Sequence, residues 1–253
     1  MEHTTRDNDY TDFGFKTVKT KLKTGLVSEL FSGVSKNYDL MNDLMSLGLH
    51  RCWKRSLVNA LDLRPNGQIL DVAGGTGDIG LRIAMDKAYL NPKVTVCDLT
   101  HAMLQQGRAR AINAGQLDIS WHNGNAEQLP YADASFDSVT IAFGLRNITN
   151  KPQALAEMAR VLKPGGKWFC LEFSPPQGPL KPFYDMYSFH LIPWVGELLA
   201  KDRNAYQYLV ESIRKFPTPD ALQSMILQYG FATCTYQKWA GGIVSLHKAT
   251  LSE

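Results

Sequence analysis

The sequence predicts an α/β fold built on a mostly parallel sheet with helices on both faces. Three observations favour this class. Short apolar segments alternate with amphipathic segments from residue 68 onward, and the first of them runs directly into a glycine-rich turn. Two late strand-like segments are also joined by the glycines at 241–242. Alternating strands and helices are typical of parallel sheets covered on both sides, whereas a glycine turn between two late strands indicates an antiparallel hairpin at a sheet edge.

The composition is that of an ordinary globular chain. Its 253 residues are 44% hydrophobic and 20% charged, which suits one α/β domain with an elaboration. The four cysteines are scattered without the paired spacing of a disulfide framework or a zinc site, so a reducing compartment is expected. The six histidines show no metal-ligand spacing, and we expect no metal. A net charge of +3 is too weak to indicate a nucleic-acid partner.

The N-terminal region is expected to lie outside the sheet. Residues 1–12 are polar, lack the apolar core of a signal peptide and are expected to be flexible. Residues 13–64 are expected to form a helical lid before any strand appears, because their apolar residues recur at helical spacing. The basic residues at 16–23 are interpreted as a solvated helix face, with contact to anionic lipid as the alternative. No run reaches the ~18 apolar residues of a transmembrane helix.

Residues 65–253 are expected to form the main domain. Thr100 is expected to cap a helix that contains Met103 and Leu104. An aromatic-rich helical insertion at 174–216 interrupts the sheet before its last two strands. Other helices are predicted at 78–88, 152–162, 206–213 and 221–229. Strands are predicted at 69–72, 93–98, 119–122, 136–143, 167–173, 231–239 and 243–249.

The turn after the first strand is the candidate cofactor site. Asp71 lies at the strand end, and Gly74, Gly75, Thr76 and Gly77 follow it. Glycine leaves backbone N–H groups uncovered, and the next helix directs its N-terminus at a bound anion, so we expect a nucleotide-like cofactor here. The segment 75–80 is also a literal G-x-G-x-x-G, which is typical of dinucleotide-binding folds. An NAD-dependent oxidoreductase is therefore the alternative function.

Asp98 is the second candidate in this site, because it ends the second predicted strand. A carboxylate at that position can accept hydrogen bonds from both ribose hydroxyls of a nucleotide. The alternative is that Asp98 caps the following turn. We prefer the ribose role because Thr100 is available as the cap.

The segment 65–250 resembles the seven-stranded methyltransferases that use S-adenosylmethionine (SAM). The resemblance rests on Asp71 before the loop, on the helical block that precedes the first strand, and on the closing hairpin. It implies SAM as methyl donor, and it places Asn125 and Ala126 at the adenine. Ala73 occupies the position where the superfamily usually has its first glycine.

Segments outside the loop resemble one family within that superfamily. Residues 38–54 and 160–166 are similar to the two signatures of the ubiquinone/menaquinone biosynthesis C-methyltransferases, and the similarity extends over about 12–250. The resemblance implies metal-free C-methylation of a prenylated quinol. The acceptor would be 2-methoxy-6-polyprenyl-1,4-benzoquinol, demethylmenaquinol or both. Ala142 lies where some members have serine, so a contact there would come from the backbone.

Arg146 is the leading catalytic candidate. It lies just past the fourth predicted strand, at the edge of the sheet where ligands bind. The resemblance also assigns it to the site. We expect Arg146 to hold the phenolate or an activating water, with Asn147 and Tyr38 completing the network. The alternatives are a structural salt bridge for Arg146, and His190 as the base.

The insertion at 174–216 fits a polyprenyl tail, although its aromatic residues also suffice for a core of their own. Because such a substrate resides in lipid, we expect a cytoplasmic enzyme in peripheral contact with the inner face of the membrane. The sequence leaves open whether the chain forms a homodimer or joins a quinone-biosynthesis complex. A catalytically idle partner in such a complex is the third functional hypothesis, and the intact loop with Asp98 opposes it.

Overall fold

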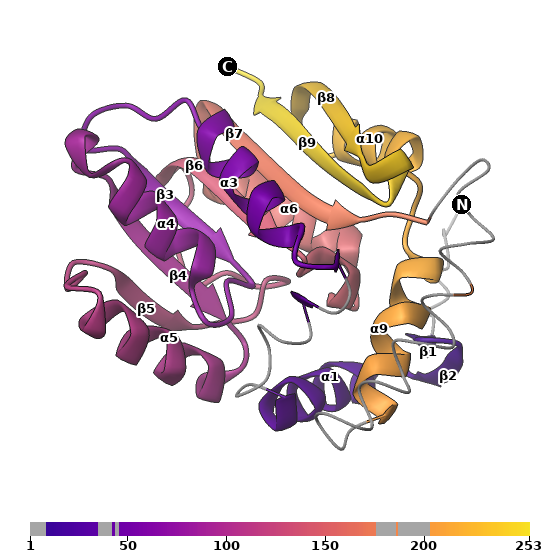
Figure 1. The fold of residues 1–253 in the computed structure, drawn as a ribbon. Helices are drawn as coiled ribbons and strands as arrows, with labels where there is room; N and C mark the ends of the chain where they lie inside the picture. The colour runs from indigo at the N-terminus through magenta and orange to yellow at the C-terminus, as the bar shows by residue number, and fades with distance from the viewer. Residues whose placement is uncertain (1–8, 35–41, 44–45, 176–185, 187–202) are drawn as a thin grey trace.

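The computed structural model describes residues 9–34, 42–43, 46–175, 186 and 203–253. A seven-stranded sheet lies between layers of helices, as the sequence predicts (Figure 1). The strand order is β5-β4-β3-β6-β7-β9-β8. These strands are β3 (Gln68–Val72), β4 (Lys93–Asp98), β5 (Ser120–Asn123), β6 (Phe136–Ala142), β7 (Leu162–Phe173), β8 (Phe231–Trp239) and β9 (Val244–Leu251).

The pairing of the strands confirms the predicted mixed sheet. β3, the first strand of the sheet, pairs in parallel with β4 on one side and β6 on the other. β9 is antiparallel to both of its neighbours, β7 and β8. The turn between β8 and β9 contains Gly241 and Gly242, whose φ values of 66° and 90° favour glycine. The closing hairpin is therefore confirmed. The parallel pairing of β3 with β4 and β6 places the carboxyl ends of these three strands at one common edge.

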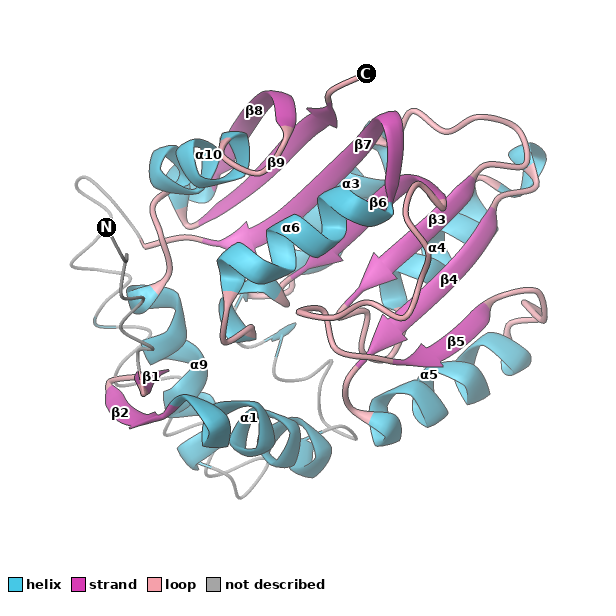
Figure 2. Cartoon of the chain, turned by 180° about the vertical axis from the view of Figure 1, so that it is seen from behind, coloured by secondary structure: helices cyan, strands magenta, loops and turns pink. Residues whose placement is uncertain are grey.

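Helices cover both faces of the sheet (Figures 1 and 2). One buried cluster joins the sheet to the first group of helices, and Leu57 and Ile83 belong to it. The other cluster, with Leu155 and Ile226, joins the opposite face to the second group. The first group comprises α3 (His50–Ala60), α4 (Asp78–Asp86) and α5 (His101–Asn113), and the second comprises α6 (Lys151–Val161) and α10 (Pro219–Leu227).

The expectation of a purely helical region from residue 13 is wrong. β1 (Tyr10–Phe13) and β2 (Lys16–Lys19) form an antiparallel hairpin, and α1 (Thr20–Val34) begins only after it. The hairpin turns at Gly14, where φ is +60° and a Cβ would lie 2.2 Å from Glu211 Oε2. Tertiary packing against a distant helix therefore fixes this turn, and the local periodicity of the sequence contains no sign of it.

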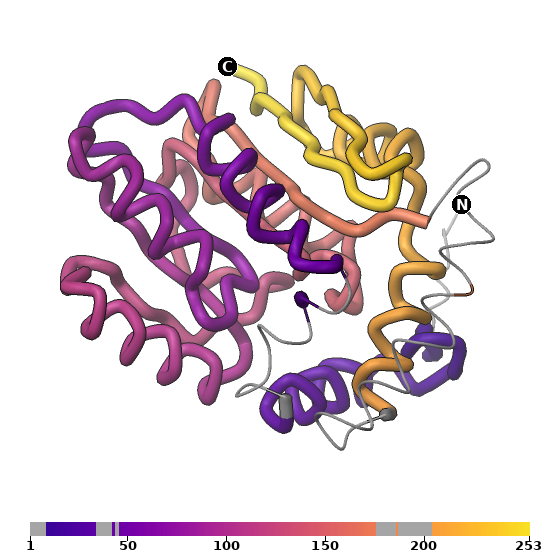
Figure 3. Tube along the Cα trace, in the orientation of Figure 1, coloured from indigo at the N-terminus to yellow at the C-terminus, as the bar shows by residue number. Residues whose placement is uncertain are grey.

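That distant helix is α9 (Arg203–Lys215). The backbone N–H of Phe15 donates to Glu211 Oε2 at 2.8 Å, and the rings of Phe13 and Tyr208 stack at 4.3 Å. In Figure 3 the indigo N-terminal segment and the orange α9 accordingly lie side by side. Two ends of the chain thus build one wall beyond the carboxyl edge of the sheet.

The segment 163–166 also differs from the expected break between a helix and a strand. α6 ends at Val161, and β7 begins at once with Leu162, so the Lys-Pro-Gly-Gly stretch lies inside the strand. A pairing irregularity between Phe136 and Ser138 accommodates it. Most of the insertion at 174–216 and residues 1–8 lie outside the described residues. Within the described part of the chain, no helix is both long and apolar enough to span a membrane.

Candidate active site

The glycine-rich loop joins β3 to α4, as predicted. Gly75 and Gly77 have φ values of 57° and 69°, and Ala73 adopts a φ of 50° without being glycine. A Cβ on Gly77 would lie 2.3 Å from the ring of Trp121, so both conformation and packing require glycine at that position. The loop is therefore held in one conformation next to the start of α4.

Asp71 supports this loop from below and does not line the cavity above it. Its side chain is buried, Oδ1 accepts a hydrogen bond from Thr140 Oγ1 at 2.8 Å, and Oδ2 accepts one from Gly80 N at 3.3 Å. Burial raises the pKa of Asp71 to about 7, although both hydrogen bonds lower it. Asp71 therefore joins β3 to β6 and to the first turn of α4, and its role at the cofactor stays a prediction.

Asp98 ties the loop to the start of α5. Oδ2 accepts from the N–H of Gly75 at 2.8 Å, and Oδ1 accepts from the N–H of Thr100 at 2.7 Å. The side chain of Thr100 makes no capping hydrogen bond, and Asp98 accepts the N–H of Thr100 instead. Our expectation that Thr100 caps this turn in place of Asp98 is therefore wrong. Each carboxylate oxygen keeps a further lone pair, which leaves Asp98 able to accept a hydroxyl from the cavity.

The main cavity opens above Gly75 and Asp98 and has about 740 Å³ of space, part of it open to solvent. Of the predicted cofactor residues it brings together Gly75, Asp98, Asn125 and Ala126, whereas Gly74, Thr76 and Gly77 do not line it. Its other walls come from α1 (Thr24, Val27, Ser28 and Phe31), from Leu99, Thr100 and Met103, and from the segment after β6 (Phe143, Gly144, Asn147, Ile148 and Thr149).

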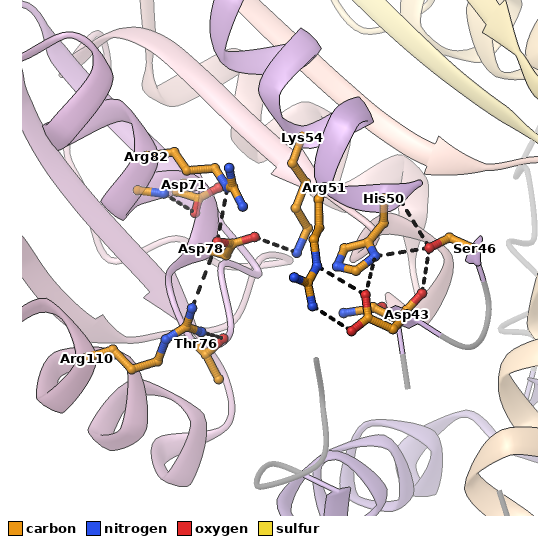
Figure 4. Close-up of polar contacts among 12 residues, drawn as sticks. Asp43, Ser46, His50, Arg51, Lys54, Asp71, Thr76, Asp78, Arg82 and Arg110 are labelled. Carbon is orange, nitrogen blue, oxygen red and sulfur yellow. Dashed lines mark hydrogen bonds and ion pairs between the residues drawn. The ribbon is translucent and has the colours of Figure 1, made fainter. Parts of the chain in front are cut away.

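A buried ion pair connects the N-terminal region to the loop, and sequence reasoning missed it. Lys54 Nζ lies 2.8 Å from Asp78 Oδ2, and the Lys54 side chain is only 4% exposed. Asp78, the first residue of α4, also pairs with Arg82 and faces Arg110 (Figure 4). Burial raises the pKa of Asp78, but these cations outweigh it and lower the pKa overall. No spacing in the sequence indicates such a pair, because α3 and α4 meet only in the fold.

The N-terminal end of α3 is fixed by a second polar network (Figure 4). Ser46 Oγ accepts from the N–H of His50 at 3.1 Å and lies 3.0 Å from its Nδ1. Arg51 donates to both carboxylate oxygens of Asp43, at 3.1 and 2.6 Å. Burial and the nearby Lys54 lower the pKa of His50 to about 4, so its ring is neutral at pH 7.

Arg146 makes the salt bridge that was the alternative to a catalytic role. It belongs to the short helix η3 (Leu145–Asn147), and its Nη1 lies 2.6 Å from Glu172 Oε1. The same nitrogen donates to Phe143 O at 2.6 Å. Nε has no hydrogen-bond partner in the described part of the chain. Arg146 lines a second, smaller cavity next to the main one, so its catalytic role stays a prediction.

Asn147 faces the main cavity, and its Oδ1 accepts a hydrogen bond from Tyr208 Oη at 3.2 Å. Sequence analysis missed Tyr208, which lies in α9 and lines the second cavity. Burial raises the pKa of Tyr208 well above its usual value, so the hydroxyl stays protonated and can donate. Tyr38, the third catalytic candidate, and His190 lie outside the described residues.

The residues present fit a nucleoside-containing cofactor such as SAM. Asp98 supplies an acceptor for ribose hydroxyls, and Leu99 and Met103 supply apolar walls for a base. At Gly75 an added Cβ would meet nothing closer than 3.9 Å, so the loop backbone is open toward the cavity. Among the described residues, no group of three or more His, Cys, Asp and Glu side chains is placed to hold a metal ion.

Known proteins are similar to this chain over most of its length. The model of the ubiE/COQ5 methyltransferase family matches residues 19–251. The chain is 51% identical to the ubiquinone/menaquinone biosynthesis C-methyltransferase UbiE of Paracoccus denitrificans, over 94% of this chain and 95% of that one. It is 45% identical to the mitochondrial 2-methoxy-6-polyprenyl-1,4-benzoquinol methylase of Dictyostelium discoideum, over 95% of this chain and 86% of that one.

Solved structures confirm the fold at low sequence identity. A phosphoethanolamine N-methyltransferase of Haemonchus contortus in complex with SAM superposes with a TM-score of 0.61 at 13% identity, over 80% of this chain and 53% of that one. A putative methyltransferase in complex with the Haloferax volcanii Trm112 activator gives a TM-score of 0.65 at 14% identity, over 88% of this chain and 98% of that one. The alternative of an NAD-dependent oxidoreductase finds no support in these comparisons. The chain therefore belongs to the ubiE/COQ5 methyltransferase family and is a C-methyltransferase whose methyl donor is SAM.

Proposed function

We propose that this enzyme methylates a ring carbon of a prenylated quinol, either 2-methoxy-6-polyprenyl-1,4-benzoquinol, demethylmenaquinol or both. The observation that supports this most is the shape of the main cavity. It extends from Asp98 to Asn147, which contacts Tyr208 and is adjacent to Arg146. The proposed nucleoside site thus lies next to Arg146 and Tyr208, which line the adjoining second cavity. The names of the relatives, a benzoquinol methylase and a ubiquinone/menaquinone C-methyltransferase, support the same acceptor class.

At the donor end, Asp98 would accept the ribose hydroxyls, and Asn125 and Ala126 would contact the adenine. The open backbone of the loop at Gly75 would lie against the amino-acid portion. When bound, SAM supplies an electrophilic methyl group on a sulfonium centre. The N-terminal region contributes through Lys54, whose ion pair with Asp78 fixes the start of α4.

At the acceptor end, the protein must stabilise negative charge on a ring oxygen, because deprotonation of a hydroxyl makes the neighbouring ring carbon nucleophilic. Arg146 is suited to electrostatic stabilisation and not to proton abstraction, since a guanidinium stays protonated. Asn147 and Tyr38 would complete the hydrogen-bonding network. Positioning of this kind supplies up to ~7–11 kcal/mol of barrier reduction in well-oriented systems.

The prenyl tail would leave the ring on the side of α1 and α9, where α9 is the described helix of the insertion at 174–216. Each methylene that is buried contributes about 0.8 kcal/mol, so a long tail favours an apolar path that opens to lipid. Peripheral contact with the inner face of the membrane, by a cytoplasmic enzyme, follows from this choice of substrate.

The test is methyl transfer with purified protein and SAM bearing a labelled methyl group. Short-chain prenyl benzoquinol and naphthoquinol acceptors are kept reduced and supplied separately. We expect label in the ring-methylated quinol, and none with NADH in place of SAM. Lack of label in both acceptors, with SAM bound, contradicts the proposed substrate class.

A further inference from the structure

The second cavity lies beside the main one and is strongly basic. It has about 400 Å³ of empty space and is lined by residues from β1, α1, η3, α6 and α9. Lys23, Arg146, Lys151 and Lys215 supply its cations, and Asp12 is the only carboxylate in the described lining. Positive charge is therefore in excess in the lining of this cavity.

Among the described residues, the two lysines Lys23 and Lys151 lack the ion-pair partners that buried charges normally have. Lys23 is 4% exposed, and no hydrogen bond or ion pair joins its ammonium to another described residue. Lys151 donates to the carbonyl of Ile148 at 3.1 Å and forms no ion pair with a described carboxylate. Arg146 keeps a buried Nε without a partner in the described part of the chain.

The carboxylates nearby are already engaged elsewhere. Asp12 lies 3.6 Å from Lys215, and Glu172 pairs with Arg146. Glu127 accepts the backbone N–H groups of Thr149 and Asn150, both at 3.0 Å. Each of these three carboxylates therefore has a hydrogen-bond or ion-pair partner other than the two lysines.

The two lysines also oppose each other electrostatically. Burial, together with the positive charge of Lys23, lowers the pKa of Lys151 to about 8. Burial likewise lowers the pKa of Lys23, although Asp12 and Glu127 raise it. Two like charges held close together destabilise the fold. A ligand anion would remove that cost.

We propose that the second cavity is an anion site that receives the ionised hydroxyl of the aromatic acceptor, with Lys23 and Lys151 as its binding cations. This inference rests on the proposed function and extends it to two residues outside the predicted catalytic set. A phenolate that is bound here would face two ammonium groups and the unpartnered Nε of Arg146.

The location of the cavity favours the acceptor over a free anion. Tyr208 lines the second cavity while its hydroxyl contacts Asn147 in the main one. Thr24, the neighbour of Lys23, lines the main cavity and lies 3.2 Å from Thr149, oxygen to oxygen. The two cavities therefore adjoin where Lys23 meets Thr24 and where Arg146 meets Asn147, so a ring beside Asn147 can direct its hydroxyl toward the second cavity.

The test uses 4-nitrophenol, whose ionisation is visible by absorbance, with the full chain saturated with S-adenosylhomocysteine. We expect wild type to bind the phenolate and to lower the apparent pKa of the probe. Charge-assisted hydrogen bonds are worth enough that Lys23→Gln and Lys151→Gln should each weaken binding about tenfold or more. Lys21→Gln is the matched control, because Lys21 is exposed on the same helix and its substitution removes the same charge.

A second measurement is the pH profile of methyl transfer. Loss of either cation should raise the pH at which the rate begins to increase by about one unit, because a phenolate that is stabilised tenfold less has a pKa one unit higher. Lys23→Arg, which keeps the charge, should restore the profile. The charged and titratable groups that face the two lysines are Asp12, Glu127, Arg146, Glu172, Tyr208 and Lys215.

Three outcomes overturn the proposal. The first is an equal loss of nitrophenolate binding in Lys21→Gln. The second is binding of inorganic phosphate that nitrophenolate cannot displace, which assigns the cavity to a free anion. The third is an unchanged pH profile in folded Lys23→Gln. Absence of quinol methylation together with Lys23-dependent nitrophenolate binding contradicts the proposed acceptor alone, so the two failures are distinguishable.

Discussion

Replacing Glu172 by Gln tests whether Arg146 acts in folding, in chemistry or in both. Glu172 is fully buried, and three donors converge on it: Arg146 Nη1 at 2.6 Å, Arg146 N at 3.2 Å and Phe173 N at 2.9 Å. The substitution removes the counter-charge and leaves a guanidinium buried without compensation. Breaking a buried pair in this way costs about 3–5 kcal/mol. With a urea m-value of about 3 kcal/mol/M, the unfolding midpoint should fall by roughly 1–1.7 M.

The double variant Arg146→Met with Glu172→Leu separates the two roles. Replacing both charges by apolar side chains of similar size is often neutral for stability, so the midpoint in urea should return toward wild type. Methyl transfer should stay well below the wild-type rate, because the guanidinium proposed to stabilise the ring oxyanion is gone, although Lys23 and Lys151 remain. Urea denaturation followed by circular dichroism, and labelled methyl transfer, are the two assays. A double variant with wild-type turnover refutes a chemical role for Arg146, and an unchanged midpoint in Glu172→Gln refutes the importance of the ion pair for stability.

Three further substitutions test the donor side. Asp98→Ala should lower the affinity for SAM, measured by calorimetry, roughly 10–150-fold for each charge-assisted hydrogen bond that is lost. Asp86→Ala, at an exposed residue, is the control. Equal SAM affinity in the two variants would contradict the ribose assignment. Lys54→Met removes one buried ion-pair partner of Asp78, while Arg82 remains as the other. We therefore expect the free energy of unfolding in urea to fall by about 1–3 kcal/mol. An unshifted urea midpoint would show that the Lys54–Asp78 ion pair does not stabilise the fold. The pKa of Asp71 in the folded state is about 7, which exceeds that of the unfolded chain. Its contribution to the free energy of unfolding is therefore complete below pH 4 and is lost as pH rises to 7, by at most about 1.4 kcal/mol per pH unit. Asp71→Asn should abolish this fall in stability, and urea midpoints that change in parallel for both proteins between pH 5 and pH 7 would disprove it.

The sheet was predictable because its strands have strong local signals. β4 and β8 were predicted with the bounds that the structure shows, since each is an apolar or alternating run between turn residues. The hairpin at 10–19 was missed because its strands have four residues each, and Glu211, far along the chain, secures its turn. Short elements that depend on tertiary contacts leave little trace in periodicity.

The lining of the candidate site could be predicted only for residues that lie at the end of a strand or just after one. Asp98 and Asn147 follow strands, and both line the main cavity. Asp71 also ends a strand, but its hydrogen bonds direct it beneath the loop, a distinction that depends on side-chain orientation. Lys23 and Tyr208 lie on helices with no motif around them, and only the packing of α1 and α9 brings them to the acceptor end.

The wall made by the N-terminal hairpin and α9 has a consequence for the order of assembly. The hydrogen bond from Phe15 to Glu211 spans 196 residues, whereas the donor side is complete once residues 68–149 and α1 have folded. Contacts of such long range form late, and a nascent chain emerges N-terminus first. The emerging chain should therefore acquire SAM affinity before it can position an acceptor. In the finished protein the same wall should open before the sheet unfolds, and hydrogen exchange at β1 and α9 should be faster than at β3.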